Sequence, residues 1–377
     1  MQNNRHDFPP KPDIVYSYNI NLFTYQSLLT RLQIGVIAIS QGISYMTDTK
    51  NRQVRLKQYP DGNPVETDFE IVESPMPECA AGQVLCRTQY LSLDPYMRSQ
   101  IAGRHMSGSI APGDVMRGES ICEVVHSNDE RFQAGDRVRC MGGWQEFTAQ
   151  KGDSLAKVPS EIDPPSLALS LLGMTGLTAW AGMICQANVQ AGDRVLIPAV
   201  TGGVGAAAAQ FCRNRGATVI GIAGSDDKCR YAKEHLGLED CINRKTEDMP
   251  ARLSELFPDG IDVFFDLVGG ELLIQASERL ALNARVVLCG LISEYNSPTR
   301  AAGPPPGYWI RSRATVYGLV VYDFEARRNE FIAACLPDLQ AGRLQQPEDL
   351  NQGIESAPAA FSRLMRGENF GKVVVAM

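Results

Sequence analysis

The sequence has few of the features that mark a metal site or a disulfide-stabilised fold. None of its ten cysteines belongs to a CxxC pair, and several lie inside apolar runs. The four histidines (His6, His105, His126 and His235) form no ligand cluster with cysteines, so the spacing predicts no zinc site. Scattered cysteines in apolar runs are typical of reduced, buried thiols, and we therefore expect a cytoplasmic protein.

Runs of basic residues and long apolar runs are also missing. The net charge is −7 and the pI is about 5.3, so we expect neither nucleic acid nor a membrane surface as a partner. Near the N-terminus, "LLTRLQIGVIAIS" is too short and too interrupted to span a bilayer. It could be amphipathic or signal-like, although it has no convincing cleavage site. We expect residues 1–45 to be a dispensable extension that is disordered or follows a mis-assigned start.

The remaining chain predicts two domains, because 377 residues at ~150 per domain suggest about two. Residues 53–160 contain short β-rich runs separated by turn signals such as "PDGNP", "APGD" and "QAGD", which indicate a mostly antiparallel β domain. The closing "ENFGKVVVAM" ends in a strand that could return to this domain. We expect a catalytic domain at 46–171 with 346–377, and a cofactor domain at 172–345.

The cofactor domain alternates apolar strands and helices after a helical stretch, "PPSLALSLLGMTGLTAWAGM". Because the strands are uninterrupted by polar residues, both faces should be buried, which predicts a parallel sheet covered by helices. The fold class is therefore α/β with a doubly wound, Rossmann-type sheet. The expected strands are 194–200, 218–223, 262–268, 285–291 and 315–321. The expected helices are about 204–214, 226–236, 249–257 and 270–281.

The turn in "LIPAVTGGVGAAAAQ" is a variant of the dinucleotide fingerprint with Ala199 in place of the first glycine. Gly202 would let the backbone approach a pyrophosphate, and Gly205 would let the helix pack closely on the strand. The helix N-terminus would offer free N–H groups to the anion. Since a strand precedes the turn and a helix follows it, the pattern predicts dinucleotide binding.

The end of the next strand distinguishes NADPH from NADH. In "GIAGSDDKCR" no carboxylate follows Ala223 directly; Ser225 and Lys228 are instead suited to a 2′-phosphate. Asp226 and Asp227 weaken this reasoning, but acidic residues are also common in a first helical turn. Lys228 could alternatively be a solvated helix lysine. Arg244 offers a second positive charge, and the predicted cofactor is NADPH.

Several blocks resemble the zinc-independent medium-chain reductases, which include leukotriene/prostaglandin reductases, plant alkenal double-bond reductases and bacterial curcumin reductases. These blocks are "LSLDPYMR", "GMTGLTAW", "AVTGGVGAAAAQ", "GIAGSDDKCRY", "FFDLVGGELL", "CGLISEYN", "GPPP", "VYDFEAR" and "APAAFSRLMRGENFGKVVV". They extend from about Val54 to Val375. The resemblance implies a GroES-like catalytic domain beside the Rossmann domain, and a homodimer, which the expected edge strand in "ATVYGLVVY" would suit.

The resemblance also implies chemistry without a metal. Zinc-dependent relatives carry a Gly-His-Glu block where this chain has Gly118 and Glu119 without a histidine, and the four-cysteine lobe is missing. The implied reaction is reduction of a carbon–carbon double bond conjugated to a carbonyl, with hydride from NADPH added to the β-carbon. Tyr295 would stabilise the enolate oxygen, and Tyr96 would line the pocket and reach the carbonyl. Alternatively, Tyr96 is only a wall residue and Tyr295 only covers the cofactor.

The family's cofactor contacts map onto four segments of this chain. They are Gly202, Gly203, Val204, Gly205 and Ala206 under the pyrophosphate; Cys289, Gly290, Ile292, Ser293 and Tyr295 along the nicotinamide ribose; the backbone of Leu319, Val320 and Val321; and Asn369. Two positions depart from the family pattern. Leu267 replaces an asparagine that touches the cofactor, and Arg244 replaces a tyrosine.

An apolar pocket with walls such as Tyr96, Met97, Trp144 and Tyr308 would suit a small hydrophobic enone or enal, for example an alkenal, an alkenone or a curcumin-like diarylheptanoid. Trp144 could equally belong to the core. Two rival functions remain open. The same hydride could reduce a quinone, or the chain could be a non-catalytic NADPH-binding protein.

Overall fold

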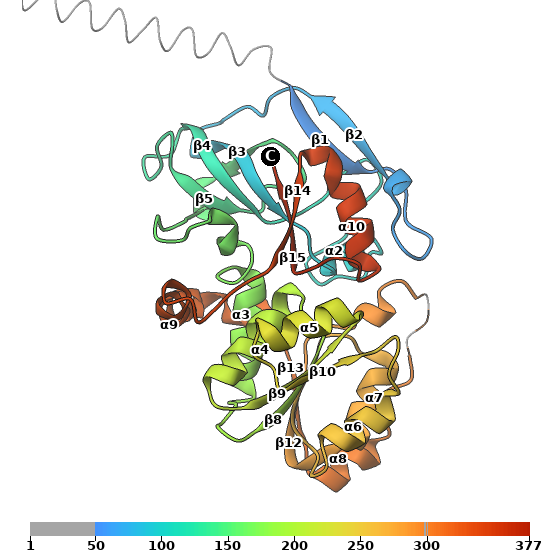
Figure 1. The fold of residues 1–377 in the computed structure, drawn as a ribbon. Coiled ribbons are helices and arrows are strands. Elements are labelled where there is room, and N and C mark those ends of the chain that lie inside the picture. The colour runs from blue at the N-terminus through green and yellow to red at the C-terminus, as the bar shows by residue number, and fades with distance from the viewer. Residues whose placement is uncertain (1–49, 298, 300) are drawn as a thin grey trace, which may run out of the picture. The chain divides into compact units, whose positions relative to one another are not determined.

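Two large β-sheets organise residues 50–297, 299 and 301–377, which are the residues that the computed structural model describes (Figure 1). The expected extension, residues 1–45, lies outside them. The α/β fold class with two different sheets is confirmed, because one sheet is parallel and the other is almost entirely antiparallel.

The antiparallel sheet is built from the N-terminal part of the chain and its C-terminal tail. The strand order is β14-β15-β3-β4-β5-β7, with β6 also paired to β3. Only β14 and β15 are parallel to each other. A separate hairpin joins β1 (Asn51–Leu56) and β2 (Phe69–Ser74). The other strands are β3 (Gln83–Ser92), β4 (Ser120–Ser127), β5 (Arg137–Cys140), β6 (Phe147–Lys151), β7 (Ala156–Lys157), β14 (Glu348–Gln352) and β15 (Lys372–Ala376).

The tail returns to this sheet as the sequence predicts. In β15, Val374 pairs with Ser92 and Ala376 pairs with Tyr90. Figure 1 shows this red strand running beside the blue strand β3. The pairing brings Lys372, at the start of β15, next to the segment that follows β3, and this places two distant family blocks side by side.

The parallel sheet has the strand order β10-β9-β8-β11-β12-β13. Its strands are β8 (Arg194–Pro198), β9 (Thr218–Ala223), β10 (Asp240–Asn243), β11 (Ile261–Asp266), β12 (Leu280–Leu288) and β13 (Thr315–Gly318). The chain order reverses between β8 and β11, which is the position where doubly wound sheets bind ligands at the carboxyl ends of their strands.

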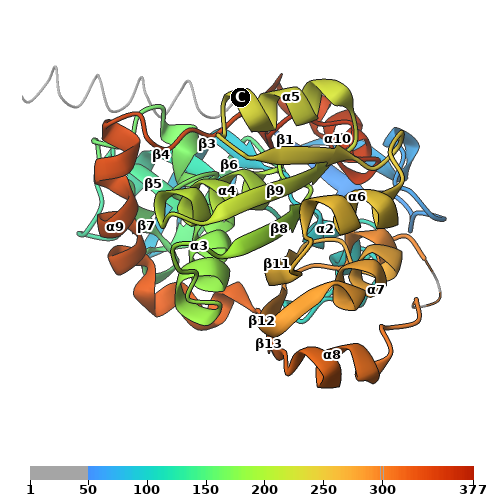
Figure 2. The ribbon, with the colours of Figure 1, turned by 60° about the horizontal axis from the view of Figure 1, so that its bottom comes forward.

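Helices cover both faces of this sheet because alternate strand residues point to opposite faces (Figure 2). Val195 and Ile197 pack with the core cluster that contains helix residues Phe211 and Trp180, whereas Leu196 packs with Leu253. The first face is covered by α3 (Met174–Trp180), α4 (Gly203–Asn214), α5 (Asp226–Glu234) and α9 (Arg328–Gln340). The second is covered by α6 (Met249–Leu256), α7 (Gly270–Glu278) and α8 (Pro306–Ser312).

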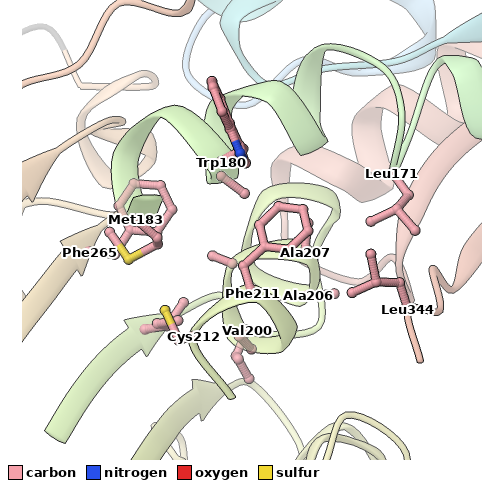
Figure 3. Packing of buried hydrophobic residues seen from close by; sticks show 14 of the residues in the cluster. Leu171, Trp180, Met183, Val200, Ala206, Ala207, Phe211, Cys212, Phe265 and Leu344 are labelled. Carbon is pink, nitrogen blue, oxygen red and sulfur yellow. The ribbon is translucent and has the colours of Figure 1, made fainter. Parts of the chain in front are cut away.

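The helix of the glycine turn, α4, is anchored by its apolar side (Figure 3). Ala206, Ala207 and Phe211 lie in one cluster with Trp180 and Leu344. Complete burial of a side chain as large as Phe211 contributes about 1.5–3 kcal/mol, so packing holds the start of this helix in place.

Three details differ from the sequence prediction. The stretch 164–183 is not one helix: a 3₁₀ turn (Pro165–Ala168) precedes α3, which begins after Gly173 and continues into a π-helix (Ala181–Gln186). A Cβ at Gly176 would lie 1.7 Å from the Leu171 carbonyl oxygen, so the chain folds back where only glycine fits. Strand β10 was not predicted, because four residues carry too little periodicity. The strand expected at 315–321 ends at Gly318.

None of the helices within the described ranges combines the length and apolarity that crossing a membrane requires.

Candidate active site

The glycine turn after β8 forms the N-terminus of α4. Gly202 is the N-cap, and the first helical hydrogen bond runs from the Ala206 amide to the Gly202 carbonyl oxygen at 2.9 Å. The amides of Gly203, Val204 and Gly205 therefore precede the first intrahelical bond, as is normal for a helix start. A row of such N–H groups on a twelve-residue helix suits a pyrophosphate.

Close packing explains the third glycine of the turn. A Cβ at Gly205 would lie 2.4 Å from the Ala199 carbonyl oxygen and 2.8 Å from the Val200 Cα, and neither backbone atom could move away. At Gly202 the nearest atom, the Ala199 oxygen, would be 3.1 Å away. The turn thus has the geometry that its spacing predicts: one glycine allows tight helix–strand packing and the other leaves the backbone accessible.

The acidic residues after β9 are held by partners of their own. Asp226 accepts a hydrogen bond from Asn243 Nδ2 at 2.6 Å, and Asp227 pairs with Arg230. Ser225 is the N-cap of α5, and its hydroxyl oxygen accepts from the Lys228 amide at 3.3 Å. The Arg230 cation offsets the charge of Asp227, whereas the Asn243 amide fixes the direction of the Asp226 carboxylate without offsetting its charge.

Three cations gather beside the end of β9. A Cβ at Gly224 would lie 3.7 Å from Arg244 Nε and 3.8 Å from Lys245 Cε. Burial, followed by the charges of Lys245 and Arg244, lowers the pKa of Lys228. Such a cluster suits a doubly charged phosphate monoester. Lys245 was missed by the sequence analysis, although it directly follows Arg244.

Lys228 also connects α5 to the tail. Its Nζ donates to the Gly367 carbonyl oxygen at 2.7 Å. Asn369, two residues further along, donates from Nδ2 to the Gly371 oxygen at 2.7 Å. This contact with the tail holds the ammonium group of Lys228 at the rim of the cation cluster.

The tyrosine expected to act on the substrate lies near the carboxyl end of β12. A Cβ at Gly290 would be 3.7 Å from the Tyr295 hydroxyl oxygen. A tyrosine with the ordinary pKa of about 10 is protonated at neutral pH, and burial raises the pKa of Tyr295 further, so its hydroxyl carries a proton that it can donate in a hydrogen bond. Burial also raises the pKa of Cys289 to about 12, which keeps this thiol protonated and a poor nucleophile.

Asp266 shapes the loop between β11 and α7 and was not among the predicted site residues. Its Oδ1 accepts from the amides of Val268 at 3.0 Å and Gly269 at 2.9 Å. Its Oδ2 is buried and has no hydrogen-bond partner among the described residues. The backbone oxygen of Asp266 accepts from the amides of Cys289 and Gly290. Asp266 therefore ties the loop after β11 to the segment that follows β12.

Tyr96 begins the short helix α2 (Tyr96–Gln100), and its ring lies against the His105 ring with centroids 5.1 Å apart. Burial, and then the nearby Asp94 and Tyr322, raise the pKa of Tyr96, so this hydroxyl too stays protonated. Burial lowers the pKa of His105, which favours the neutral imidazole.

Two expected pocket walls belong to the core instead. Met97 and Trp144 are both 0% exposed, and the Trp144 ring stacks on Phe69 with centroids 5.7 Å apart. The prediction that Met97 lines the pocket is wrong, because the first turn of α2 points this side chain inward. Trp144 belongs to the core, which was the alternative expected for it. Tyr308 lies on α8 beside Arg311, and α8 packs against α7 and β12.

The remaining predicted positions follow the ends of strands. Leu319 is buried, and its amide donates to the Leu288 oxygen at 2.9 Å, so the segment after β13 lies beside the end of β12. Val204, Leu267, Cys289 and Val321 pack against the core cluster around α4. The structure thus brings the glycine turn, 289–295 and 319–321 to the same end of the parallel sheet.

The place of the zinc-family histidine block is occupied by an ion pair. Glu119 pairs with Arg139, which also lies 3.2 Å from Glu325. Across residues 50–297, 299 and 301–377, no three His, Cys, Asp or Glu side chains are grouped so that they could hold a metal ion. The residues in these ranges therefore do not fit a zinc site.

Comparison with known proteins identifies the relatives. Residues 52–158 match the family model described as the N-terminal domain of oxidoreductase, and residues 203–336 match the model described as zinc-binding dehydrogenase. The chain is 36% identical over 337 residues to a 2-alkenal reductase (NADP(+)-dependent) of Nicotiana tabacum, covering 87% of this chain and 98% of the relative. It is 34% identical over 333 residues to the NADPH-dependent curcumin reductase of Escherichia coli K12, covering 86% and 96%.

A solved structure agrees with these relatives. CurA of Vibrio vulnificus in complex with NADPH superposes with a TM-score of 0.82 at 35% identity, covering 86% of this chain and 99% of that chain. With both sheets, the glycine turn and the tyrosine block in place, the chain belongs to the medium-chain reductase family that includes the curcumin and 2-alkenal reductases.

Proposed function

We propose that this protein is an NADPH-dependent oxidoreductase that reduces the carbon–carbon double bond of α,β-unsaturated ketones and aldehydes. The relatives named above act with NADPH or NADP(+) on alkenals or curcumin. The observation that carries the proposal is the protonated Tyr295 hydroxyl near Gly290, at the strand ends where a doubly wound sheet binds its ligand.

The cofactor's phosphates are assigned to the two positively polarised places of the Rossmann sheet. The amides of Gly203, Val204 and Gly205 would hold the pyrophosphate, and the cations of Lys228, Arg244 and Lys245 would hold the 2′-phosphate. The segments 289–295 and 319–321 would line the nicotinamide ribose, with Asn369 nearby. Bound NADPH supplies the hydride that adds to the β-carbon of the substrate.

The protein's part in the chemistry is to orient the enone and stabilise negative charge on its oxygen. Tyr295 and Tyr96 are assigned as hydroxyl donors to the carbonyl by the resemblance to the family, and both are protonated at neutral pH because their pKa values are raised above the ordinary 10. A neutral donor suffices, since conjugation already makes the β-carbon electrophilic. A donor aimed at the developing enolate oxygen lowers the barrier more than it strengthens binding of the ground state.

The proposal includes four further points. Catalysis needs no zinc. In support, Glu119 lies where zinc-dependent relatives carry their histidine block, and its carboxylate is already paired with Arg139. The enzyme is a homodimer, for which the edge strand β13 offers unpaired backbone groups. It acts in the cytoplasm, in keeping with the ten free cysteines. Its catalytic domain comprises 46–171 with 346–377, and its cofactor domain comprises 172–345.

A panel of substrates tests the proposal. NADPH oxidation is measured with 2-alkenals, alkenones, curcumin and quinones, and NADH is run beside it. The expected result is NADPH-dependent formation of saturated ketones and aldehydes. Formation of hydroquinone alone would assign the chain as a quinone reductase, and tight NADPH binding without turnover of any substrate would make it a non-catalytic binding protein.

A further inference from the structure

Arg98 makes an unusual pair of contacts for a buried arginine. It lies in α2, two residues after Tyr96, and is 4% exposed. Its Nε donates to Asn296 Oδ1 at 2.9 Å, and its terminal NH₂ donates to the Gly62 carbonyl oxygen at 2.9 Å. Both acceptors are uncharged, whereas buried guanidinium groups usually pair with carboxylates. An ion pair therefore does not explain why this guanidinium group is buried.

The two acceptors of Arg98 are themselves connected. Asn296 Nδ2 donates to Asn63 Oδ1, and Asn63 directly follows Gly62. Helix α2, the turn 60–64 and the loop 292–297 therefore form a closed triangle of hydrogen bonds. The turn is the "PDGNP" segment, and Gly62 adopts φ +76°, which favours glycine and lets its carbonyl oxygen meet the guanidinium.

One corner of the triangle, Asn296, directly follows Tyr295 in the chain. On the same side, Arg104 donates to the carbonyl oxygens of Tyr295 at 3.3 Å and Ser297 at 3.2 Å. On the other side, the amide and hydroxyl of Ser293 donate to the Val268 oxygen at 3.1 and 2.7 Å. The short helix Ile292–Glu294 and Tyr295 are thus held between the Rossmann sheet and α2.

We infer that Arg98 and Asn296 are positioning residues, which orient the Tyr295 hydroxyl by fixing its loop to the helix that carries Tyr96. The inference rests on the proposed function, since it assumes that Tyr295 donates to the substrate carbonyl. The triangle couples the two tyrosines into one rigid donor set. A small misplacement of such a donor can lower turnover by about 100-fold.

Variants of the triangle test this inference. Arg98→Met and Asn296→Leu remove it, whereas Asn296→Asp retains an acceptor for Arg98. Arg285→Met is the control, because Arg285 in β12 also donates to carbonyl oxygens, those of Ala187 at 2.9 Å and Asn188 at 3.2 Å, and pairs with Asp193, none of which belongs to the triangle. We expect Arg98→Met and Asn296→Leu to lower kcat for an alkenone about 10- to 100-fold. The Kd for NADPH should stay within about twofold, and Asn296→Asp should recover most of the rate.

Two readouts separate positioning from a loss of stability. Hydrogen exchange of residues 291–297 should increase in Arg98→Met but not in Arg285→Met, even if both variants melt at lower temperatures. In a double-mutant cycle, Arg98→Met should change kcat less than about threefold once Tyr295→Phe is present, because the Tyr295 hydroxyl that Arg98 orients is then missing.

Three results would overturn the positioning role of Arg98 and Asn296. Equal losses from Arg98→Met in the presence and absence of the Tyr295 hydroxyl would overturn it while leaving the proposed function intact. A kcat loss that only tracks the fraction of unfolded protein would do the same. If the unmodified enzyme failed to saturate any enone, the proposed function would fall first and the inference with it.

Discussion

Lys372 Nζ lies 3.1 Å from Asp94 Oδ1, and both side chains are almost completely buried, 3% and 4% exposed. The ammonium group also donates to the carbonyl oxygens of Leu93 at 2.7 Å and Val373 at 3.0 Å, and Asp94 accepts from the Ser92 hydroxyl. A Cβ at Gly203 would lie 3.0 Å from Lys372 Cδ. The pair therefore joins the tail, the segment before Tyr96 and the glycine turn.

Breaking this pair should destabilise the protein strongly. Lys372→Met leaves the Asp94 carboxylate buried without its counter-ion, and removing one partner of a buried pair costs about 3–5 kcal/mol of unfolding free energy. Urea denaturation followed by circular dichroism measures this. Arg87→Met is the control, since Arg87 and Glu123 form a largely exposed pair at 2.7 Å that should contribute less than about 1 kcal/mol. A Lys372→Met variant as stable as this control would contradict the role of the pair.

Tyr295→Phe should remove a donor without disturbing the fold. Because the hydroxyl is assigned to the developing enolate, we expect kcat for an alkenone to fall about 10²- to 10³-fold, with NADPH affinity nearly unchanged. Stopped-flow turnover and fluorescence titration of NADPH measure the two quantities. Tyr231→Phe is the matched control, because burial also raises the pKa of Tyr231, whose ring stacks on His235 and which is not among the predicted site residues. An unchanged rate in Tyr295→Phe would show that this tyrosine only covers the cofactor.

Lys228→Ala should weaken the preference for NADPH over NADH. A charge-assisted bond to phosphate contributes about 1.5–3 kcal/mol, so the ratio of kcat/KM for the two coenzymes should fall about 10- to 100-fold. Lys233→Ala, on the same helix, removes a half-exposed lysine 3.5 Å from Asp240 and should leave the ratio unchanged. Equal losses from both variants would place the 2′-phosphate elsewhere.

The preference for NADPH over NADH should also become weaker at alkaline pH. Only the protonated Lys228 attracts a phosphate, and burial together with Lys245 and Arg244 lowers the pKa of Lys228 below its ordinary 10.5. Hence kcat/KM for NADPH, which reports the free enzyme, should begin to fall at a lower pH than an ordinary lysine would impose. The fall should be partial, because Arg244 keeps its charge. A parallel fall with NADH would point to denaturation and contradict the assignment.

Much of the fold followed from local patterns. Strands β8, β9, β11 and β12 are apolar runs separated by amphipathic helices, so periodicity alone indicated a doubly wound sheet. The four-residue strand β10 carried too little signal. The break of the helix 164–183 could not be predicted, because it depends on the contact between Gly176 and the Leu171 carbonyl, which only the folded chain creates.

The site residues also divide into those with a local sequence signal and those without one. The glycine turn and Lys228 have local signals, and their geometry agrees with the spacing. Met97 was predicted as a pocket wall because an apolar wall suits a hydrophobic enone, but helical geometry turns the neighbouring side chains of Tyr96 and Met97 in different directions. The contacts of Asp266 and Arg98 link segments that are far apart in the chain, so no local pattern predicts them, whereas Lys245 could have been found from its place beside Arg244.

The most direct test of the account is the position of the transferred hydrogen. An alkenone is reduced with NADPH that carries deuterium at C4 of the nicotinamide, and the product is analysed by NMR. We expect a saturated ketone with deuterium on the β-carbon, because the hydride adds there. Deuterium on a carbinol carbon, with the double bond intact, would contradict it.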